Sequence, residues 1–160
     1  MTPARFTVLM AEDAGPIDLD EVSLLMSGVL QPELDAIEWL AALDQLAAEC
    51  PTATADGVGR YLFGELGFSG NREAYYDWRN SCLDRVIATR TGIPISLSVL
   101  MIEVARRVGV PLVGVSMPAH FLVRAADDDS VFYDPFDGGR QLDRAGAREL
   151  FERITLGKAP

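Results

Sequence analysis

The sequence predicts an α+β domain, in which a central buried helix packs on an antiparallel sheet and a helical region comes first. Two patterns carry this prediction. Apolar residues recur at helical spacing through 19–108, whereas 112–142 consists of short apolar runs separated by turn residues. The length of 160 residues suits one compact unit, in which an acidic helical region at 1–70 covers a core at 71–160.

The chain is acidic, and its charge is unevenly distributed. The net charge is -10, and residues 1–70 hold 12 acidic against two basic side chains. Such a surface argues against nucleic acid or an anionic membrane as the partner. Two cysteines are too few for a disulfide-rich scaffold or a Cys-based zinc site. One histidine with scattered carboxylates gives no metal-ligand spacing, and we expect no metal and no cofactor. The sequence shows neither a signal peptide nor a run of about 18 apolar residues, which predicts a cytoplasmic protein.

Capping residues predict where the helices of the acidic region begin. Asp18 and Thr54 are side chains that accept hydrogen bonds from free N–H groups at a helix start, and Pro32 suits a first helical turn. The predicted helices cover 19–30, 32–48 and 55–66.

The acidic side chains on these helices have two interpretations. They form a solvated helical surface, or they form a docking face for a basic partner that includes Glu33, Asp35 and Glu38. No pair of these carboxylates has a spacing that singles it out for acid–base chemistry.

The second half of the chain contains the predicted central helix. Residues 97–108 are apolar on nearly every side, which is typical of a helix buried within a domain, and Gly109 ends it. The other predicted elements are a helical turn at 71–76, a helix from 80 that Gly92 ends, strands at 112–117, 120–124, 131–133 and 140–142, and a last helix over 144–154 capped by Asp143.

His120 is the one histidine of the chain, and Asp134 is its predicted partner. His120 begins one predicted strand and Asp134 follows the next, so a simple hairpin brings them within hydrogen-bond reach. An aspartate on one imidazole nitrogen fixes the tautomer and leaves the other nitrogen to face a nucleophile. A structural His–Asp contact without chemistry is the alternative.

Two residues are candidate nucleophiles. Ser96 lies near the start of the central helix, where N–H groups stabilise an anion, although capping the helix explains it equally. Cys82 has the more acidic group, and Arg79 and Arg85 lie nearby, although a buried cysteine often serves only as packing. Asn80 and Ser81 are candidate substrate-binding residues or helix caps.

Six segments together resemble the SirB1 family of bacterial proteins, which is part of the transglutaminase-like superfamily with its papain-like fold. The resemblance covers about 33–154. The segments are NSCL at 80–83, GIPISLS at 92–98, EVARR at 103–107, GVPL at 109–112, PAHFLV at 118–123 and DPFDGG at 134–139.

The resemblance implies a Cys–His–Asp triad in active members of the superfamily. His120 matches the histidine and Asp134 the aspartate, whereas the cysteine is expected near the start of the central helix. That stretch holds no cysteine, a feature the chain shares with the SirB1 pattern, and Ser96 is the nearest polar replacement. Cys82 departs from the family, which usually has an aromatic or bulky residue there.

These observations leave two main hypotheses. In the first, the domain keeps the His–Asp pair, has lost efficient thiol chemistry, and binds a peptide or protein segment in the old active-site groove as a regulatory domain. In the second, it is an active hydrolase or acyltransferase that uses Ser96 or Cys82 with His120 as base and Asp134 as orienting residue.

Overall fold

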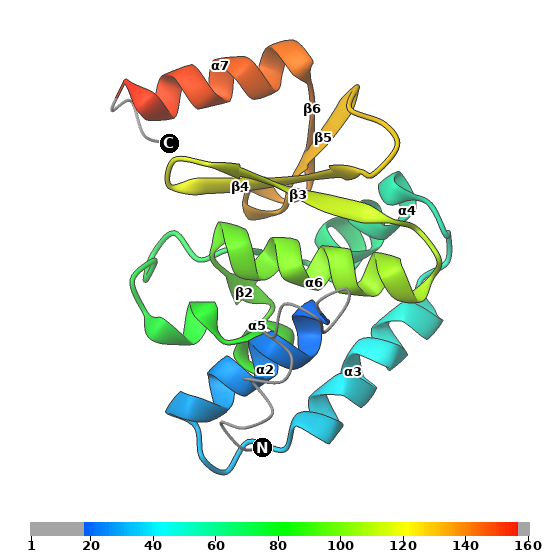
Figure 1. Ribbon diagram of the computed structural model, residues 1–160, viewed down its shortest axis with the longest axis vertical. Coiled ribbons are helices and arrows are strands. Elements are labelled where there is room, and N and C mark those ends of the chain that lie inside the picture. The colour runs from blue at the N-terminus through cyan, green and yellow to red at the C-terminus, as the bar shows by residue number, and fades with distance from the viewer. Residues whose placement is uncertain (1–17, 157–160) are drawn as a thin grey trace, which may run out of the picture.

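The computed structural model describes residues 18–156, so the acidic region before residue 18 lies outside the described residues. The elements stack in layers (Figure 1): helix α7 lies on one face of a four-stranded sheet, α6 lies on the other face, and the N-terminal helices pack beneath α6. The helices are α2 (Leu19–Leu30), α3 (Ala36–Glu49), α4 (Ala55–Gly59), α5 (Leu83–Thr89), α6 (Pro94–Arg107) and α7 (Arg144–Thr155). The α+β prediction is confirmed.

The four-stranded sheet is an antiparallel meander, as the sequence predicts. Its order follows the chain, and the turn between the first two strands is tight, with Met117 paired to His120. Its strands are β3 (Leu112–Met117), β4 (His120–Ala125), β5 (Val131–Asp134) and β6 (Arg140–Asp143). A short parallel pair outside this sheet, β1 (Ser69–Gly70) with β2 (Thr91–Gly92), was not predicted, because two-residue strands leave no periodic signal.

Helix α6 is the centre of the core. Leu97, Leu100, Met101 and Val104 are fully buried between the sheet and the N-terminal helices. Truncating such a side chain to alanine typically costs about 2–5 kcal/mol of unfolding free energy. On the opposite face of the sheet, a smaller apolar cluster that includes Leu150 attaches α7.

An ion-pair cluster joins the carboxyl end of α6 to the N-terminal helices. Arg107 contacts Glu103 (2.9 Å), Asp20 of α2 (2.6 Å) and Asp44 of α3 (2.7 Å), and Arg106 contacts both Glu103 and Asp20. Glu103 and Asp20 are buried, and a buried carboxylate is tolerated only when it is paired. The cluster therefore fixes the helical cover onto the central helix.

The two buried carboxyl groups have opposite pKa shifts. Burial raises the pKa of Glu103 above its ordinary value, and Arg106 only partly opposes this. Burial also raises the pKa of Asp20, but hydrogen bonds from Arg107 and from the Glu21 backbone N–H, with the charges of both arginines, bring it below its ordinary value.

Two predicted N-terminal helix starts differ from the structure in detail. Pro32 lies in a turn, and α3 begins four residues later because the carboxylate of Asp35 accepts the Ile37 N–H at 3.0 Å. Asp18 stands at the N-cap of α2 as predicted, but its side chain makes no capping hydrogen bond. Thr54 caps α4 through the Gly57 N–H, and the helix continues as a π-helix over Arg60–Glu65.

Two further predictions were wrong around residues 71–92. The segment 71–77 is a loop of turns, in which Asn71 Oδ1 accepts the Ala74 N–H instead of opening a helix. A 3₁₀ turn over Trp78–Ser81 precedes α5, which ends at Arg90 with φ 58° rather than at Gly92. Gly92 serves close packing, since a Cβ there would lie 2.7 Å from Ser96 Oγ.

Candidate active site

His120 and Asp134 form a buried hydrogen-bonded pair at one edge of the sheet. His120 Nε2 lies 2.9 Å from Asp134 Oδ2. The other carboxylate oxygen, Oδ1, accepts the backbone N–H groups of Phe136 (3.1 Å) and Asp137 (3.2 Å), which fixes the carboxylate. A carboxylate acceptor places the proton of a neutral imidazole on Nε2 and leaves the lone pair on Nδ1.

The pair is held in place by an aromatic ring. Phe136 packs edge-on against His120 with ring centroids 6.1 Å apart, and Arg72 lies over the same ring at 4.9 Å. Gly70 of β1 provides the space for this ring, because a Cβ there would come within 2.4 Å of Phe136. The short β1–β2 pair therefore has a role in the site: its glycine backbone lets Phe136 approach.

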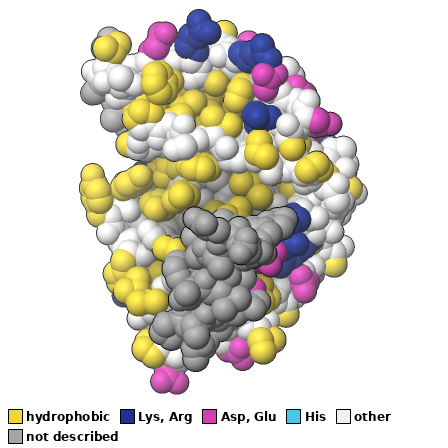
Figure 2. All heavy atoms as spheres, in the orientation of Figure 1, with side chains coloured by type: hydrophobic (Ala, Val, Ile, Leu, Met, Phe, Trp, Pro, Cys, Tyr) yellow, Lys and Arg dark blue, Asp and Glu magenta, His cyan; other side chains and the backbone are white. Residues whose placement is uncertain are grey.

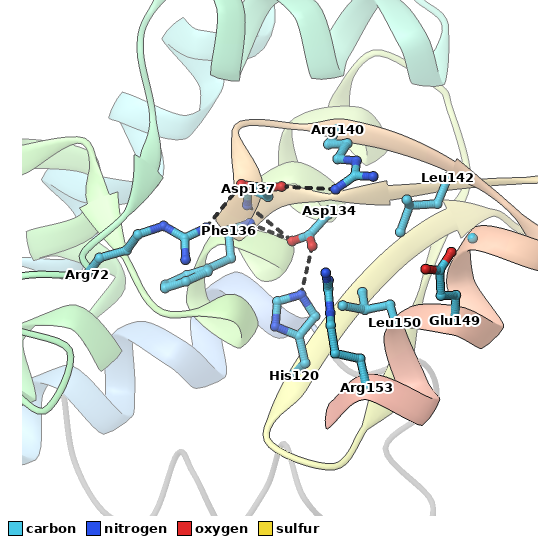
Figure 3. A pocket seen from close by; sticks show the side chains of 11 residues that line it. Arg72, His120, Asp134, Phe136, Asp137, Arg140, Leu142, Glu149, Leu150 and Arg153 are labelled. Carbon is cyan, nitrogen blue, oxygen red and sulfur yellow. Dashed lines mark hydrogen bonds and ion pairs between the residues drawn. The ribbon is translucent and has the colours of Figure 1, made fainter. Parts of the chain in front are cut away.

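Three adjoining cavities meet at His120, on the side where the β3–β4 turn, the start of α6 and the end of α7 lie (Figure 1). The first, about 80 Å³, is lined by Arg72, His120, Asp134, Phe136, Asp137, Arg140, Leu142, Gly146, Glu149, Leu150 and Arg153 (Figure 3). The second, about 530 Å³, is lined by Arg72, Tyr75, Tyr76, Pro94, Ala119, His120, Phe136 and Ile154. The third, about 240 Å³, is lined by Tyr75, Ile93, Pro94, Ile95, Ser116, Met117, Ala119, His120 and Phe121.

The start of α6 presents apolar side chains to these cavities. Pro94 and Ile95 line them, whereas Ser96 is turned into the protein. Ser96 Oγ donates to the Asn80 carbonyl at 2.6 Å and accepts the Ile93 N–H at 3.1 Å. Its hydrogen bonds to the described residues thus all go to backbone groups and none to the imidazole.

Cys82 is the residue directly before α5. Its thiol is buried and donates to the Trp78 carbonyl at 3.7 Å. Burial raises the pKa of Cys82 above its ordinary value, outweighing a hydrogen bond with Ser27 of α2. The three cavities at His120 do not include Cys82 among their lining residues.

The three adjoining cavities at His120 are called the groove below, and the 71–77 loop forms one of its walls. Asn80 holds this loop through hydrogen bonds. Its Nδ2 donates to the carbonyls of Ala74 (2.7 Å) and Tyr75 (3.2 Å), and its Oδ1 accepts from Asn71 at 3.0 Å. Asn80 is buried, so it contacts the loop rather than the cavities, and Ser81 is exposed outside them.

Comparison with known proteins assigns this arrangement to a family. Residues 30–160 match the sequence profile of the transglutaminase-like superfamily. The chain belongs to this superfamily. No solved structure matches the transglutaminase-like chain.

Relatives of this transglutaminase-like domain occur in bacteria and in mammals. A UPF0162 protein of Xylella fastidiosa (strain Temecula1) is 44% identical over an alignment of 163 positions, which covers 95% of the chain and 58% of the relative. A UPF0162 protein of Vibrio cholerae is 33% identical, over 81% of the chain and 52% of the relative. F-box only protein 21 of Mus musculus is 39% identical, over 59% of the chain and 16% of the relative. The chain thus spans little more than half the length of these bacterial relatives.

The structure brings together part of the predicted site of the transglutaminase-like domain. His120 and Asp134 meet, while the hydroxyl of Ser96 and the thiol of Cys82 bond to backbone carbonyls elsewhere. The roles assigned to these four residues, and to Asn80 and Ser81, remain predictions.

Several groove residues were missed by the sequence analysis. Arg72, Tyr75, Tyr76 and Arg153 line the cavities although none lies in a periodic element near His120 in the sequence. The available signal was the cluster of three aromatic residues at 75–78, which is unusual for an exposed loop. Within residues 18–156, no helix is long and apolar enough to cross a membrane, and no group of three His, Cys, Asp or Glu side chains is placed to hold a metal.

Proposed function

We propose that this chain is a SirB1-type transglutaminase-like domain that has kept the His–Asp pair, lacks a working nucleophile, and binds a peptide or protein segment in the groove at His120. The observation that carries the proposal is the start of α6. At the start of α6, where the resemblance places the nucleophile, the residues that line the cavity are Pro94 and Ile95. An alkyl side chain neither attacks a carbonyl nor forms an anion.

The two candidate nucleophiles support the same proposal. Activation of a hydroxyl requires a base within about 2.6–3.2 Å, yet the Ser96 hydroxyl donates to the Asn80 carbonyl. Activation of a thiol requires a lowered pKa, yet burial raises the pKa of Cys82.

The groove has the composition of a peptide-binding surface. Tyr76 is almost fully exposed at 97%, and Tyr75, Phe136 and Ile154 form apolar walls beside it. Figure 2 shows hydrophobic side chains gathered between the sheet and the helices beneath it, on the side of the molecule in view. Exposed aromatic rings next to a groove are typical of sites where a partner buries its own apolar side chains.

We propose further that the partner is a protein or peptide and neither a nucleic acid nor a membrane, and that the domain acts in the cytoplasm. The net charge of -10 supports a partner other than nucleic acid or membrane, since an acidic chain repels phosphate backbones and anionic lipids.

One observation favours the second candidate function, a hydrolase or acyltransferase. The His120–Asp134 bond of 2.9 Å retains the geometry of a general base with its orienting residue. In that reaction Ser96 or Cys82 attacks an acyl carbon, His120 takes the proton, and N–H groups at the start of α6 hold the oxyanion. The bond to the leaving group then breaks, the leaving group departs with the proton from His120, and water or an amine takes the acyl group.

Retention and mass analysis of peptides distinguish the two functions. The 160-residue chain is immobilised and incubated with a mixed pool of synthetic ten-residue peptides. We expect peptides to be retained without any change in mass, and retention to fall with Tyr76→Ala. Ile37→Ala is the matched control, because Ile37 is 78% exposed on α3 and outside the three cavities.

Catalytic turnover of the peptides would distinguish an enzyme from a domain that only binds them. Peptide hydrolysis or acyl transfer that disappears in His120→Ala contradicts the proposal. Labelling of Ser96 by an acyl-phosphonate, or of Cys82 by a thiol reagent, in a His120-dependent way supports the hydrolase.

A further inference from the structure

Three arginines line the smallest of the three cavities, which we call the basic cavity after them. Arg72, Arg140 and Arg153 surround it together with His120 (Figure 3). They come from the 71–77 loop, β6 and α7, so three separate segments place a guanidinium at one small cavity. The lining also holds the carboxylates of Asp134, Asp137 and Glu149, so the pairing of each arginine decides whether it can bind a ligand.

One of these arginines has no acidic partner. Arg72 and Arg140 both pair with Asp137, at 3.0 and 3.6 Å. The Arg153 side chain makes no ion pair or hydrogen bond with any residue of 18–156, and Figure 3 shows it extending from α7 toward Asp134 and His120. Glu149, one turn earlier on α7, lines the same cavity without pairing with Arg153.

Shared lining residues fix the order of the cavities. The basic cavity shares Arg72, His120 and Phe136 with the large apolar cavity, which in turn shares Tyr75, Pro94 and Ala119 with the third. The basic cavity shares only His120 with the third, so it lies at one end of the groove. At about 80 Å³ it is the smallest of the three cavities and has room for a carboxylate.

We propose that the groove binds the C-terminal end of a peptide, with the terminal carboxylate on Arg153 and a bulky apolar side chain on Tyr75 and Tyr76. This inference rests on the proposed peptide-binding function and names the chemistry of the partner. A guanidinium binds a carboxylate through two parallel N–H donors, and a chain terminus fits a cavity in which the groove ends.

Glu149 determines which anion is accepted. Its carboxylate opposes a second negative charge in the same cavity, so a singly charged carboxylate is favoured over a phosphate group. Removing this charge with Glu149→Gln therefore tightens carboxylate binding.

The test compares two pools of ten-residue peptides on the immobilised chain, one with free C-terminal carboxylates and one with C-terminal carboxamides. We expect retention of the first pool, enriched in peptides with a bulky apolar residue near the end. A retained peptide is then titrated by fluorescence anisotropy. Loss of a charge-assisted hydrogen bond predicts about tenfold or greater weakening with the carboxamide and with Arg153→Gln.

Two variants on α7 sharpen the titration. Arg148→Gln is the matched control, because Arg148 is exposed on the same helix and lies outside the basic cavity, and it should change affinity by less than about twofold. Glu149→Gln should increase affinity. An equal loss with Arg148→Gln and Arg153→Gln overturns the proposal.

The outcomes separate this inference from the proposed function. If carboxylate and carboxamide peptides are retained equally, peptide binding stands and C-terminal recognition is wrong. If retention depends on Arg153 but comes from internal aspartate or glutamate, the terminal carboxylate is likewise wrong. If neither pool is retained, both proposals fail.

Discussion

The two ends of α6 differ in whether the charged and polar side chains around them are paired. At the carboxyl end, Arg107 contacts three carboxylates, and the buried Glu103 and Asp20 are both paired. At the amino end, the cavities meet a free imidazole nitrogen and an unpaired guanidinium on Arg153. The paired end holds the fold together, whereas the open end leaves groups for a ligand.

The largest effect is expected at the paired end. Arg107→Ala leaves Asp20 and Glu103 buried with Arg106 alone, and breaking a buried ion pair costs about 3–5 kcal/mol of unfolding free energy. Urea denaturation measures the loss. Arg60→Ala, which breaks a solvent-exposed ion pair with Asp56, is the control and should cost less than about 1 kcal/mol. Equal losses in the two variants contradict the structural role of the cluster.

A thiol at the open end tests whether only the nucleophile is missing. Ile95→Cys places a thiol on the cavity wall, beside His120 and within the first turn of α6. A helix N-terminus and an imidazole both lower a thiol pKa, so alkylation at pH 7 should be about tenfold faster than for a free cysteine.

The control for this variant is His120→Ala in the same background, which should slow alkylation. An Ile95→Cys thiol that reacts no faster than an ordinary cysteine means that the helix start does not face the imidazole productively.

Ser96→Ala distinguishes a structural serine from a nucleophile. Its loss removes the hydrogen bond to the Asn80 carbonyl and leaves the Ile93 N–H with a weaker partner, which should cost about 1 kcal/mol of stability. We expect peptide retention to persist. Abolition of a measured hydrolytic activity, with stability unchanged, supports the hydrolase instead.

The smallest effect concerns the protonation of Asp20. Its pKa is lowered in the fold, so its stabilising contribution is present above the unfolded pKa near 3.8 and is lost as pH falls through the folded pKa. The difference in unfolding free energy between the wild type and Asp20→Asn should therefore shrink as pH decreases below about 4. Denaturation curves at pH 7, 5 and 3 measure it, and a constant difference contradicts the shift.

Glu103 acts in the opposite direction over a higher pH range. Its pKa is raised, so its contribution is present below the unfolded value of 4.5 and is lost as pH rises through the folded pKa. The negative charge of Asp20 contributes to raising the pKa of Glu103, so the comparison with Asp20→Asn reports on both carboxyl groups together.

Local patterns predicted most of the elements and the His–Asp pair. The strand at Leu112–Met117 has the predicted bounds, and α6 and α7 begin within a few residues of their predicted starts, because capping and period are local properties. The start of α3 was misplaced because Pro32 and Asp35 both suit a helix start, and only the cap made by Asp35 forms.

The sequence by itself determined the α+β architecture, the central helix and the meeting of His120 with Asp134, since these follow from periodicity and from adjacent strands of a meander. Only the tertiary structure decided the direction of Ser96, the placement of Ile95 on the cavity wall, and the approach of Arg153 from α7. The physical reason is that a side chain's neighbours across a fold depend on the packing of segments distant in the chain, which no local pattern encodes.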